Sequence, residues 1–346
     1  MGSELPLPPA VDLHEDVSLY YIRTPRGLPL GDFREDVPGR HGDIPKYMRA
    51  NVRVVFAGIA TSIRGFSPYR ASKLSAVYGS RNAWSPVAKY RAPLDMLWEH
   101  LVTYYKMSDV YGIRVVESVE DFEDCLRGGW RLCFLLQLEG AEPVEDPDDL
   151  VLLRKLGLRC LTLTWNYTNK YASGCGSRKD LGLTDEGEEL VAEAQRLRIL
   201  VDLAHASRRT MLDVLSIARR PVIVSHGNPR RLVDTPRNVD DEVLELLRRN
   251  GGVVGISAIV SSLTGRSEAT VEDLVQHFTY VRDTFGVDLL AIGTDFFGIT
   301  SVPRGFESID KLPELYRRLM DRGFSEEDIA KVAYGNVLRV IRQSLT

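Results

Sequence analysis

Apolar residues are grouped along the chain in eight short runs that few polar positions interrupt. Such a run is typical of a strand in a parallel sheet, because helices cover both faces of the sheet and neither face meets water. The eight runs occupy residues 11–16, 52–60, 131–140, 159–166, 199–207, 221–227, 251–258 and 289–296. The pattern therefore predicts eight buried, parallel strands.

Most intervals between these runs carry apolar residues at helical spacing. The clearest of the predicted helices span residues 183–198, 207–220 and 239–250. Asp185 is the expected N-cap of the first helix, because Glu188 three positions later nearly completes a capping box. Gly251 directly follows the third helix and is expected to end it.

Strands and helices that alternate around eight strands are typical of a (β/α)8 TIM barrel, so we predict this α/β fold as a single domain over residues 1–346. A doubly wound open sheet is the alternative, but no GxGxxG motif follows the first strand. Residues 61–92, rich in serine, arginine and aromatic residues, are predicted to form a long loop over the active face. Residues 325–345 are predicted to form a helix that closes the barrel on its outside.

Composition narrows the classes of function. The chain has 346 residues, 44% of them hydrophobic, and a formal net charge of −4, which gives no reason to expect a nucleic-acid or anionic membrane surface. The first ten residues lack the features of a signal peptide, and no apolar stretch is long enough to span a membrane, so we expect a soluble cytoplasmic protein. The four cysteines have no CxxC spacing and are expected to be free, with a Cys125–Cys133 disulfide as the alternative.

Polar side chains gather where the predicted strands end, which is where barrels of this class place their active sites. Three of the chain's six histidines are among them. Residues at alternate positions of a strand point to the same side, so neighbours such as His14 and Asp16 can face one centre. The full set is His14, Asp16, Glu139, His205, His226 and Asp295.

Three imidazoles and three carboxylates are more than a closed, four-coordinate zinc site uses. They suit two divalent ions about 3.5–4 Å apart that share a carboxylate and lower the pKa of a bridging water toward about 7. One such histidine alone is more often a core residue, and Glu139 or Asp295 alone could begin a loop or cap a helix. Because all six occupy matching strand ends, we predict a metal centre of two ions, with zinc, cobalt and manganese all compatible with the ligands.

Several longer segments extend this pattern over nearly the whole chain. They read DLHED (12–16), HGDIP (41–45), LEG (138–140), LTLTWN (161–166), GLTDEGEELV (182–191), LVDLAHAS (200–207), PVIVSHGNPR (221–230), PRNVDDEVL (236–244), NGGVVGIS (250–257), AIGTDF (291–296) and GNVLRV (335–340). In this order and spacing the chain resembles the renal (membrane) dipeptidase family, zinc peptidases of the amidohydrolase-like barrel group. The resemblance implies a zinc-dependent dipeptidase that hydrolyses its substrate with a hydroxide bridging two zinc ions. It also implies that a D-residue can be accepted at the C-terminal position, and a homodimer is expected by analogy.

The resemblance also implies a role for each residue of the site. His14 and Asp16 match the ligands of one zinc, His205 and His226 match those of the other, and Glu139 matches the carboxylate that bridges both.

Two further residues have implied roles in the reaction. Asp295 matches the aspartate that holds the attacking water and moves its proton, and Arg237 matches the arginine that pairs with the carboxylate of the substrate.

Three positions depart from the family pattern. Trp165 replaces a histidine near the scissile bond, Phe297 replaces an aspartate, and residues 257–259 replace an aromatic pair. Trp165 and Asn166 are predicted substrate contacts, as are Tyr167 and the loop 61–92. Because the pocket differs, hydrolysis of N-acyl amino acids or lactones on the same metals is an alternative, and a non-catalytic small-molecule binder is a third.

Overall fold

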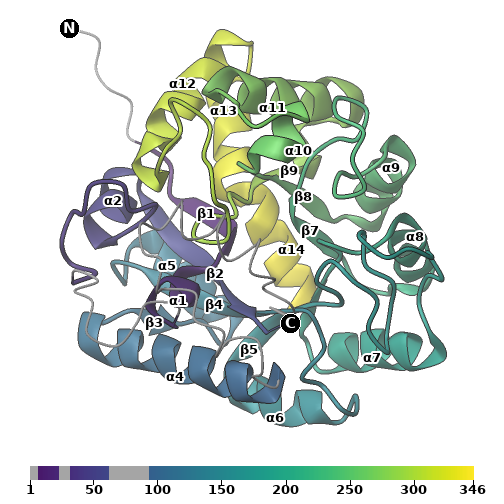
Figure 1. Cartoon of the computed structure of the whole chain (residues 1–346). Coiled ribbons are helices and arrows are strands. Elements are labelled where there is room, and N and C mark those ends of the chain that lie inside the picture. Colours follow the sequence, from purple (N-terminus) through teal and green to yellow (C-terminus); the bar gives the residue numbers. More distant parts are fainter. Residues whose placement is uncertain (1–6, 23–31, 62–92) are drawn as a thin grey trace, which may run out of the picture.

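In the computed structural model, which describes residues 7–22, 32–61 and 93–346, eight parallel strands close into a barrel (Figure 1). The hydrogen-bonded order is β2-β1-β9-β8-β7-β6-β5-β4, and β2 pairs with β4 to complete the circle. The strands are β1 (Ala10–Glu15), β2 (Val52–Ala60), β4 (Cys133–Glu139), β5 (Leu158–Thr162), β6 (Leu200–Asp202), β7 (Ile223–Gly227), β8 (Val253–Ile256) and β9 (Leu290–Ile292). Each coincides with one of the eight predicted runs to within one residue at its start or lies inside it, so the predicted barrel is confirmed.

Two sequence segments differ from the simple alternation of strand and helix. A two-residue strand, β3 (Arg114–Val115), pairs with β4 outside the barrel and was not predicted, since two residues make no recognisable apolar run. Residues 62–92 of the predicted loop over the active face lie outside the described residues.

Helices surround the barrel on its outside (Figure 1). They are α1 (Val17–Ile22), α2 (Ile44–Arg49), α4 (Pro93–Tyr111), α5 (Val119–Arg127), α6 (Asp149–Lys155), α7 (Asp185–Arg196), α8 (Arg208–Ile217), α9 (Asp241–Asn250), α10 (Val260–Thr264), α11 (Val271–Phe285), α12 (Leu312–Asp321), α13 (Glu326–Ala330) and α14 (Asn336–Ser344). None of these described helices combines the length and the apolar character that a membrane-spanning helix requires.

The three helices predicted individually are α7, α8 and α9, and one of their predicted caps is wrong. Thr184, not Asp185, is the N-cap of α7, because its hydroxyl accepts a hydrogen bond of 3.0 Å from the backbone N–H of Gly187. Asp185 instead occupies the first turn, where a negative charge interacts favourably with the helix dipole. Gly251 ends α9 with φ of 82°, as expected.

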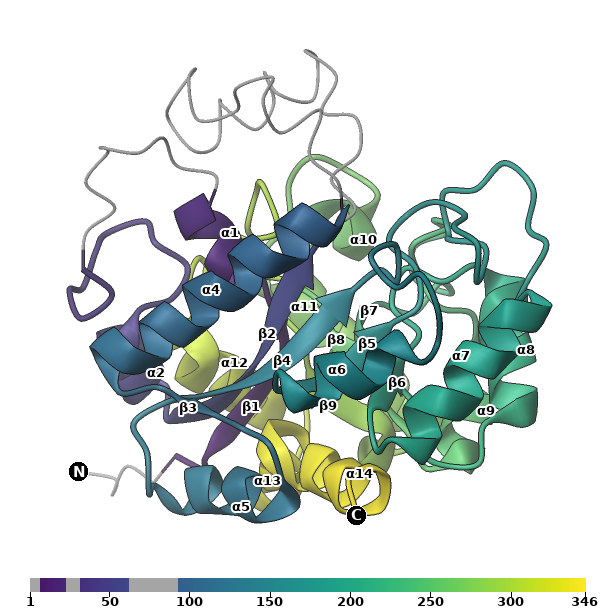
Figure 2. The same cartoon turned by 90° about the horizontal axis from the view of Figure 1, so that it is seen from below.

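The C-terminal segment closes the barrel from outside, at one of its two ends. A π-helical turn (Lys331–Gly335) joins α13 to α14, and both helices lie at the end of the barrel opposite α1 and α10 (Figure 2). Val340 and Ile341 of α14 are fully buried against residues that begin the strands, such as Val11 and Val253. The predicted closing segment is therefore confirmed, and it covers the apolar interior of the barrel where its strands begin.

Cys125 of α5 and Cys133 of β4 form a disulfide, whereas Cys160 and Cys175 are free. The expectation that all four thiols are free is therefore wrong for this pair. The chain returns from α5 directly into β4, so the two α-carbons lie 6.3 Å apart, within the usual range for a disulfide.

Candidate metal centre

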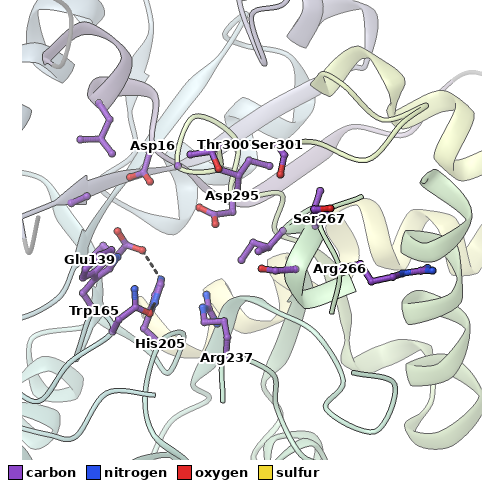
Figure 3. Close-up of a pocket in the computed structure, with 18 residues that line it drawn as sticks. Asp16, Glu139, Trp165, His205, Arg237, Arg266, Ser267, Asp295, Thr300 and Ser301 are labelled. Atoms are coloured by element: carbon purple, nitrogen blue, oxygen red, sulfur yellow. Dashed lines mark hydrogen bonds and ion pairs between the residues drawn. The ribbon is translucent and has the colours of Figure 1, made fainter. Parts of the chain in front are cut away.

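The ends of five strands bring together all six residues that the sequence indicated. Glu139, the last residue of β4, lies at the centre, and three imidazoles surround its Oε1 atom. Figure 3 shows one of them, the ring of His205, beside Glu139. The Nε2 atom of His205 is 2.9 Å from Glu139 Oε1, and the Nε2 atoms of His14 and His226 are each 3.5 Å from it.

Two aspartates complete the cluster on the side of β1. Asp16 Oδ2 and Asp295 Oδ1 both lie 3.8 Å from His14 Nε2. The ligand atoms consequently form two groups that could each hold a cation, one of His14, Glu139 and His226 and one of His14, Asp16 and Asp295. Within each group these atoms lie within 4.8 Å of one another.

The three rings are oriented by oxygen atoms that accept hydrogen bonds from their Nδ1 atoms. The partners are Gln137 Oε1 for His14, Asn166 Oδ1 for His205 and Ser225 Oγ for His226, each at 2.8 Å. With a proton on each Nδ1, every Nε2 lone pair faces the cluster, as in metal-ligating histidines.

Two details of this arrangement test whether a cation fits. The Nε2 atoms of His205 and His226 lie only 2.9 Å apart, so their lone pairs would repel each other unless a positive charge lies beside both. His14 Nε2 is buried and has no hydrogen-bond partner among the described residues. Buried polar atoms rarely remain unsatisfied, so the donor set suits divalent metal ions.

Glycines leave the space in which these side chains meet. A Cβ atom at Gly298 would lie 2.4 Å from Asp16 Oδ2 and 2.5 Å from Asp295 Oδ1. At Gly58 of β2 it would lie 2.6 Å from Asp16 Oδ1. These distances are below the range of ordinary contacts, so a side chain at either position would displace a carboxylate of the cluster.

The backbone is strained where the loops present the cluster. His205, Asp295 and Phe297 have φ of 63°, 62° and 66°, a conformation that residues with side chains rarely adopt. The Nδ1 atom of His41 accepts a hydrogen bond of 2.8 Å from the N–H of Phe297, and its ring packs on Phe296 and Phe297. His41 therefore helps to hold the loop that carries Asp295.

Burial and neighbouring charge shift the pKa values of the cluster in opposite directions. Burial, with the nearby charge of Asp16, raises the pKa of Glu139 well above its ordinary value, and burial raises the pKa of Asp295 to about 7. Burial, with the nearby positive charge of Arg237, lowers the pKa values of His205 and His226 well below the ordinary value. Both of these imidazoles are therefore neutral at pH 7, the state in which histidine binds metals.

The cluster opens into a cavity of about 480 Å³, and Arg237 lines its wall (Figure 3). The Nη2 atom of Arg237 donates a hydrogen bond of 2.7 Å to the carbonyl oxygen of His226. Its Nε and Nη1 atoms are buried and have no hydrogen-bond partner among the described residues. The guanidinium thus presents unused donors to whatever occupies the cavity.

Of the other predicted substrate contacts, Trp165 and Asn166 line the cavity, although Asn166 also holds the ring of His205. The Trp165 ring lies 6.1 Å from that of His205, centroid to centroid. Phe297, by contrast, packs against His41 and does not line the cavity, so its replacement of a family aspartate leaves no side chain facing the cavity at that position.

Gln137 and Ser225, which hold two of the rings, and Asp202, which holds both of these residues, were not predicted from the sequence. The signal was present, since each is a polar residue inside an otherwise apolar strand. Fully buried polar residues of this kind need hydrogen-bond partners, and here those partners lead to the metal-facing histidines.

Known proteins resemble this chain over nearly its whole length. The family model described as membrane dipeptidase (peptidase family M19) matches residues 7–346. An uncharacterized dipeptidase of Schizosaccharomyces pombe is 34% identical, with 96% of this chain and 80% of that protein covered. Dipeptidase 3 of Homo sapiens is 30% identical over 88% of this chain and 64% of its own length. Dipeptidase tcpJ of Claviceps purpurea is 31% identical over 74% of this chain and 61% of its own length.

The chain thus spans less than two thirds of the length of some curated relatives. Among solved structures, a metallopeptidase of Rhodobacter sphaeroides, liganded with a phosphinate mimic of the dipeptide L-Ala-D-Ala, superposes with a TM-score of 0.81. The superposition covers 98% of this chain and 100% of the other at 24% identity, which establishes a shared fold.

Proposed function

The chain belongs to the membrane dipeptidase family, peptidase family M19, and from that premise we propose that it is a metal-dependent hydrolase that cleaves the peptide bond of dipeptides. The observation that carries the proposal is the convergence of three imidazole Nε2 atoms on one oxygen of Glu139. A guanidinium with unused donors lines the same cavity.

We assign two divalent ions to this centre, with zinc as the expected metal. His14 and Asp16 would hold one ion, His205 and His226 the other, and Glu139 both. Such ions, when bound, lower the pKa of a water molecule and polarise the carbonyl that it attacks.

The protein's own groups bind the substrate and move the proton. Asp295 is buried at the cavity floor beside Asp16 and His14, where its carboxylate can accept a proton from the attacking water and return it to the leaving amine. Arg237 binds the C-terminal carboxylate of the substrate through its free N–H groups. We extend the proposal to dipeptides with a C-terminal D-residue, since the Rhodobacter relative was solved with a mimic of one.

One observation favours a second substrate class. Apart from the metal cluster, no acidic side chain lines the cavity among the described residues, and two arginines do. The α-ammonium group of a dipeptide therefore has no dedicated acidic partner there. N-acyl amino acids and lactones carry no ammonium group, so they are the alternative substrates.

A substrate panel tests the proposal. Dipeptides with L- and D-residues at the C-terminus, N-acyl amino acids and lactones are assayed before chelation, after chelation and after zinc is added back. Dipeptide turnover that chelation abolishes and zinc restores is the expected result. Dipeptide turnover at background with brisk turnover of another class would move the assignment to that class. A purified protein that takes up no divalent ion would instead indicate a binder without catalytic activity.

A further inference from the structure

The carboxylate of Asp202, the last residue of β6, is fully buried and accepts five hydrogen bonds. Its Oδ1 atom accepts from the backbone N–H of Ser225 at 2.8 Å and of Ala204 at 3.0 Å. Its Oδ2 atom accepts from Thr162 Oγ1 and Ser225 Oγ at 2.7 Å and from Gln137 Nε2 at 2.8 Å. None of these groups lines the cavity, so Asp202 does not contact the substrate.

Two of these donors continue to the metal-facing histidines. Ser225 has one hydroxyl proton and gives it to Asp202, so its oxygen must accept from Nδ1 of His226. The amide nitrogen of Gln137 also donates to Asp202, so its oxygen faces Nδ1 of His14 and must accept from it. The reverse orientation of the amide would place two acceptors 2.8 Å apart.

We propose that Asp202 is a positioning residue that fixes the tautomers of His14 and His226 together, through Gln137 and Ser225. An ionised carboxylate only accepts hydrogen bonds, so it sets the direction of both chains. Each ring then keeps its proton on Nδ1 and its lone pair on Nε2, toward Glu139. The inference rests on the proposed metal centre. The Asp202 carboxylate would orient one ligand of each ion, His14 of the first and His226 of the second.

An isosteric variant tests this direction without removing volume. In Asp202→Asn the two backbone N–H groups keep the amide oxygen on the Oδ1 side, which places the NH2 group where Oδ2 was. Ser225 must then accept from Asn and donate to His226, and the Gln137 amide must turn to donate to His14. Both rings would carry their proton on Nε2, the atom that faces the metals.

The measurement is the tautomer of each histidine in the chelated full-length chain, read from the 15N chemical shifts of its ring at a pH high enough for both rings to be neutral. We expect Nδ1 protonation of His14 and His226 in the wild-type chain and Nε2 protonation of both in Asp202→Asn. We also expect zinc affinity, measured by competition with a chelator, to fall by about 10–100-fold. Wild-type tautomers in Asp202→Asn would overturn the proposal, because a purely structural role would leave the ring protons in place.

Two further variants keep the test decisive. Asp12→Asn is the matched control, since Asp12 is also buried in a strand and accepts from two backbone N–H groups and a hydroxyl. None of these three hydrogen bonds continues to the Nδ1 atom of His14 or His226. This variant should leave both tautomers unchanged. If Asp202→Asn does not fold, Ser225→Ala is the substitute, because it removes the acceptor of the Nδ1 proton of His226 but not that of His14. The tautomer of His226 should then change while that of His14 stays the same, and an unchanged tautomer of His226 would refute the inference. A wild-type chain that keeps both Nδ1 protons yet hydrolyses no dipeptide would refute the proposed activity alone.

Discussion

At the scale of single residues, Gly298 sets how closely two carboxylates approach the metal centre. Because an added Cβ would meet oxygens of both Asp16 and Asp295 below 3 Å, Gly298→Ala must displace one or both. We expect the variant to fold but to bind less zinc per chain than the wild type, measured by elemental analysis after dialysis. Gly335→Ala is the control, since its Cβ would meet Ala330 at an ordinary 3.5 Å. Equal zinc content in all three proteins would contradict this explanation.

Arg237 is expected to act on substrate binding through charge. Arg237→Met removes the free donors while it keeps part of the apolar stem, so kcat/KM for a dipeptide should fall by about 10²-fold or more, the scale of a lost charge-assisted pair. Steady-state kinetics with a dipeptide and its C-terminal amide provide the check. In Arg237→Met, kcat/KM should fall much less for the amide than for the dipeptide with its free carboxylate. An equal fall for both substrates would show that Arg237 does not bind the carboxylate.

The metal-facing residues were predictable because each is a histidine or acid at the end of an apolar strand. The residues behind them were not singled out, because one polar residue inside a strand indicates burial but not its partner. Asp202 and Gln137 lie 65 positions apart, and only the barrel closure brings them within 2.8 Å.

At the scale of elements, His41 connects the segment before α2 to the loop after β9. Burial lowers the pKa of His41 to about 4, below the ordinary 6.5, so the unfolded chain binds a proton here that the folded chain does not. This contribution to stability is complete above about pH 6.5 and is lost as the pH falls toward 4.

We therefore expect His41→Asn, whose amide oxygen can still accept from Phe297, to lose less stability on acidification than the wild type. The free energy of unfolding of the chelated chains in urea, at pH 7.5 and pH 5, measures this difference. The other buried histidines are common to both proteins and cancel. An identical pH dependence in both would exclude His41 as the source.

The closing helix α14 is expected to stabilise the barrel without contributing to the site. Ile341 is fully buried at the strand beginnings, so Ile341→Ala should lower the free energy of unfolding by about 2–5 kcal/mol. Arg342→Ala, at an exposed ion pair with Glu123, should cost less than about 1 kcal/mol. Zinc content should equal that of the wild type in both variants. A similar decrease in the free energy of unfolding of the two variants would contradict the position assigned to α14.

Element types were predictable because burial on both faces leaves an apolar run, whereas exact ends depended on local contacts. Thr184 rather than Asp185 caps α7 because its hydroxyl reaches the N–H of Gly187, a geometry that two adjacent capping residues do not reveal in sequence. The place of α14 depended on which end of the barrel lacked a cover, and only the closed sheet defines that end.

At the scale of the whole molecule, one closed barrel brings His14 and Asp295, 281 positions apart in sequence, to 3.8 Å. The pairing of β2 with β4 and of β1 with β9 makes this possible, because it places the last strand beside the first. The proposed activity depends on this convergence and on the charge of the ions that these side chains would hold.

The most direct measurement of that claim is anomalous diffraction at the zinc absorption edge, from crystals grown with zinc. We predict two peaks about 3.5–4 Å apart, one within bonding distance of His14 and Asp16, the other of His205 and His226, and both beside Glu139. A single peak, or peaks that these side chains do not ligate, would contradict the account.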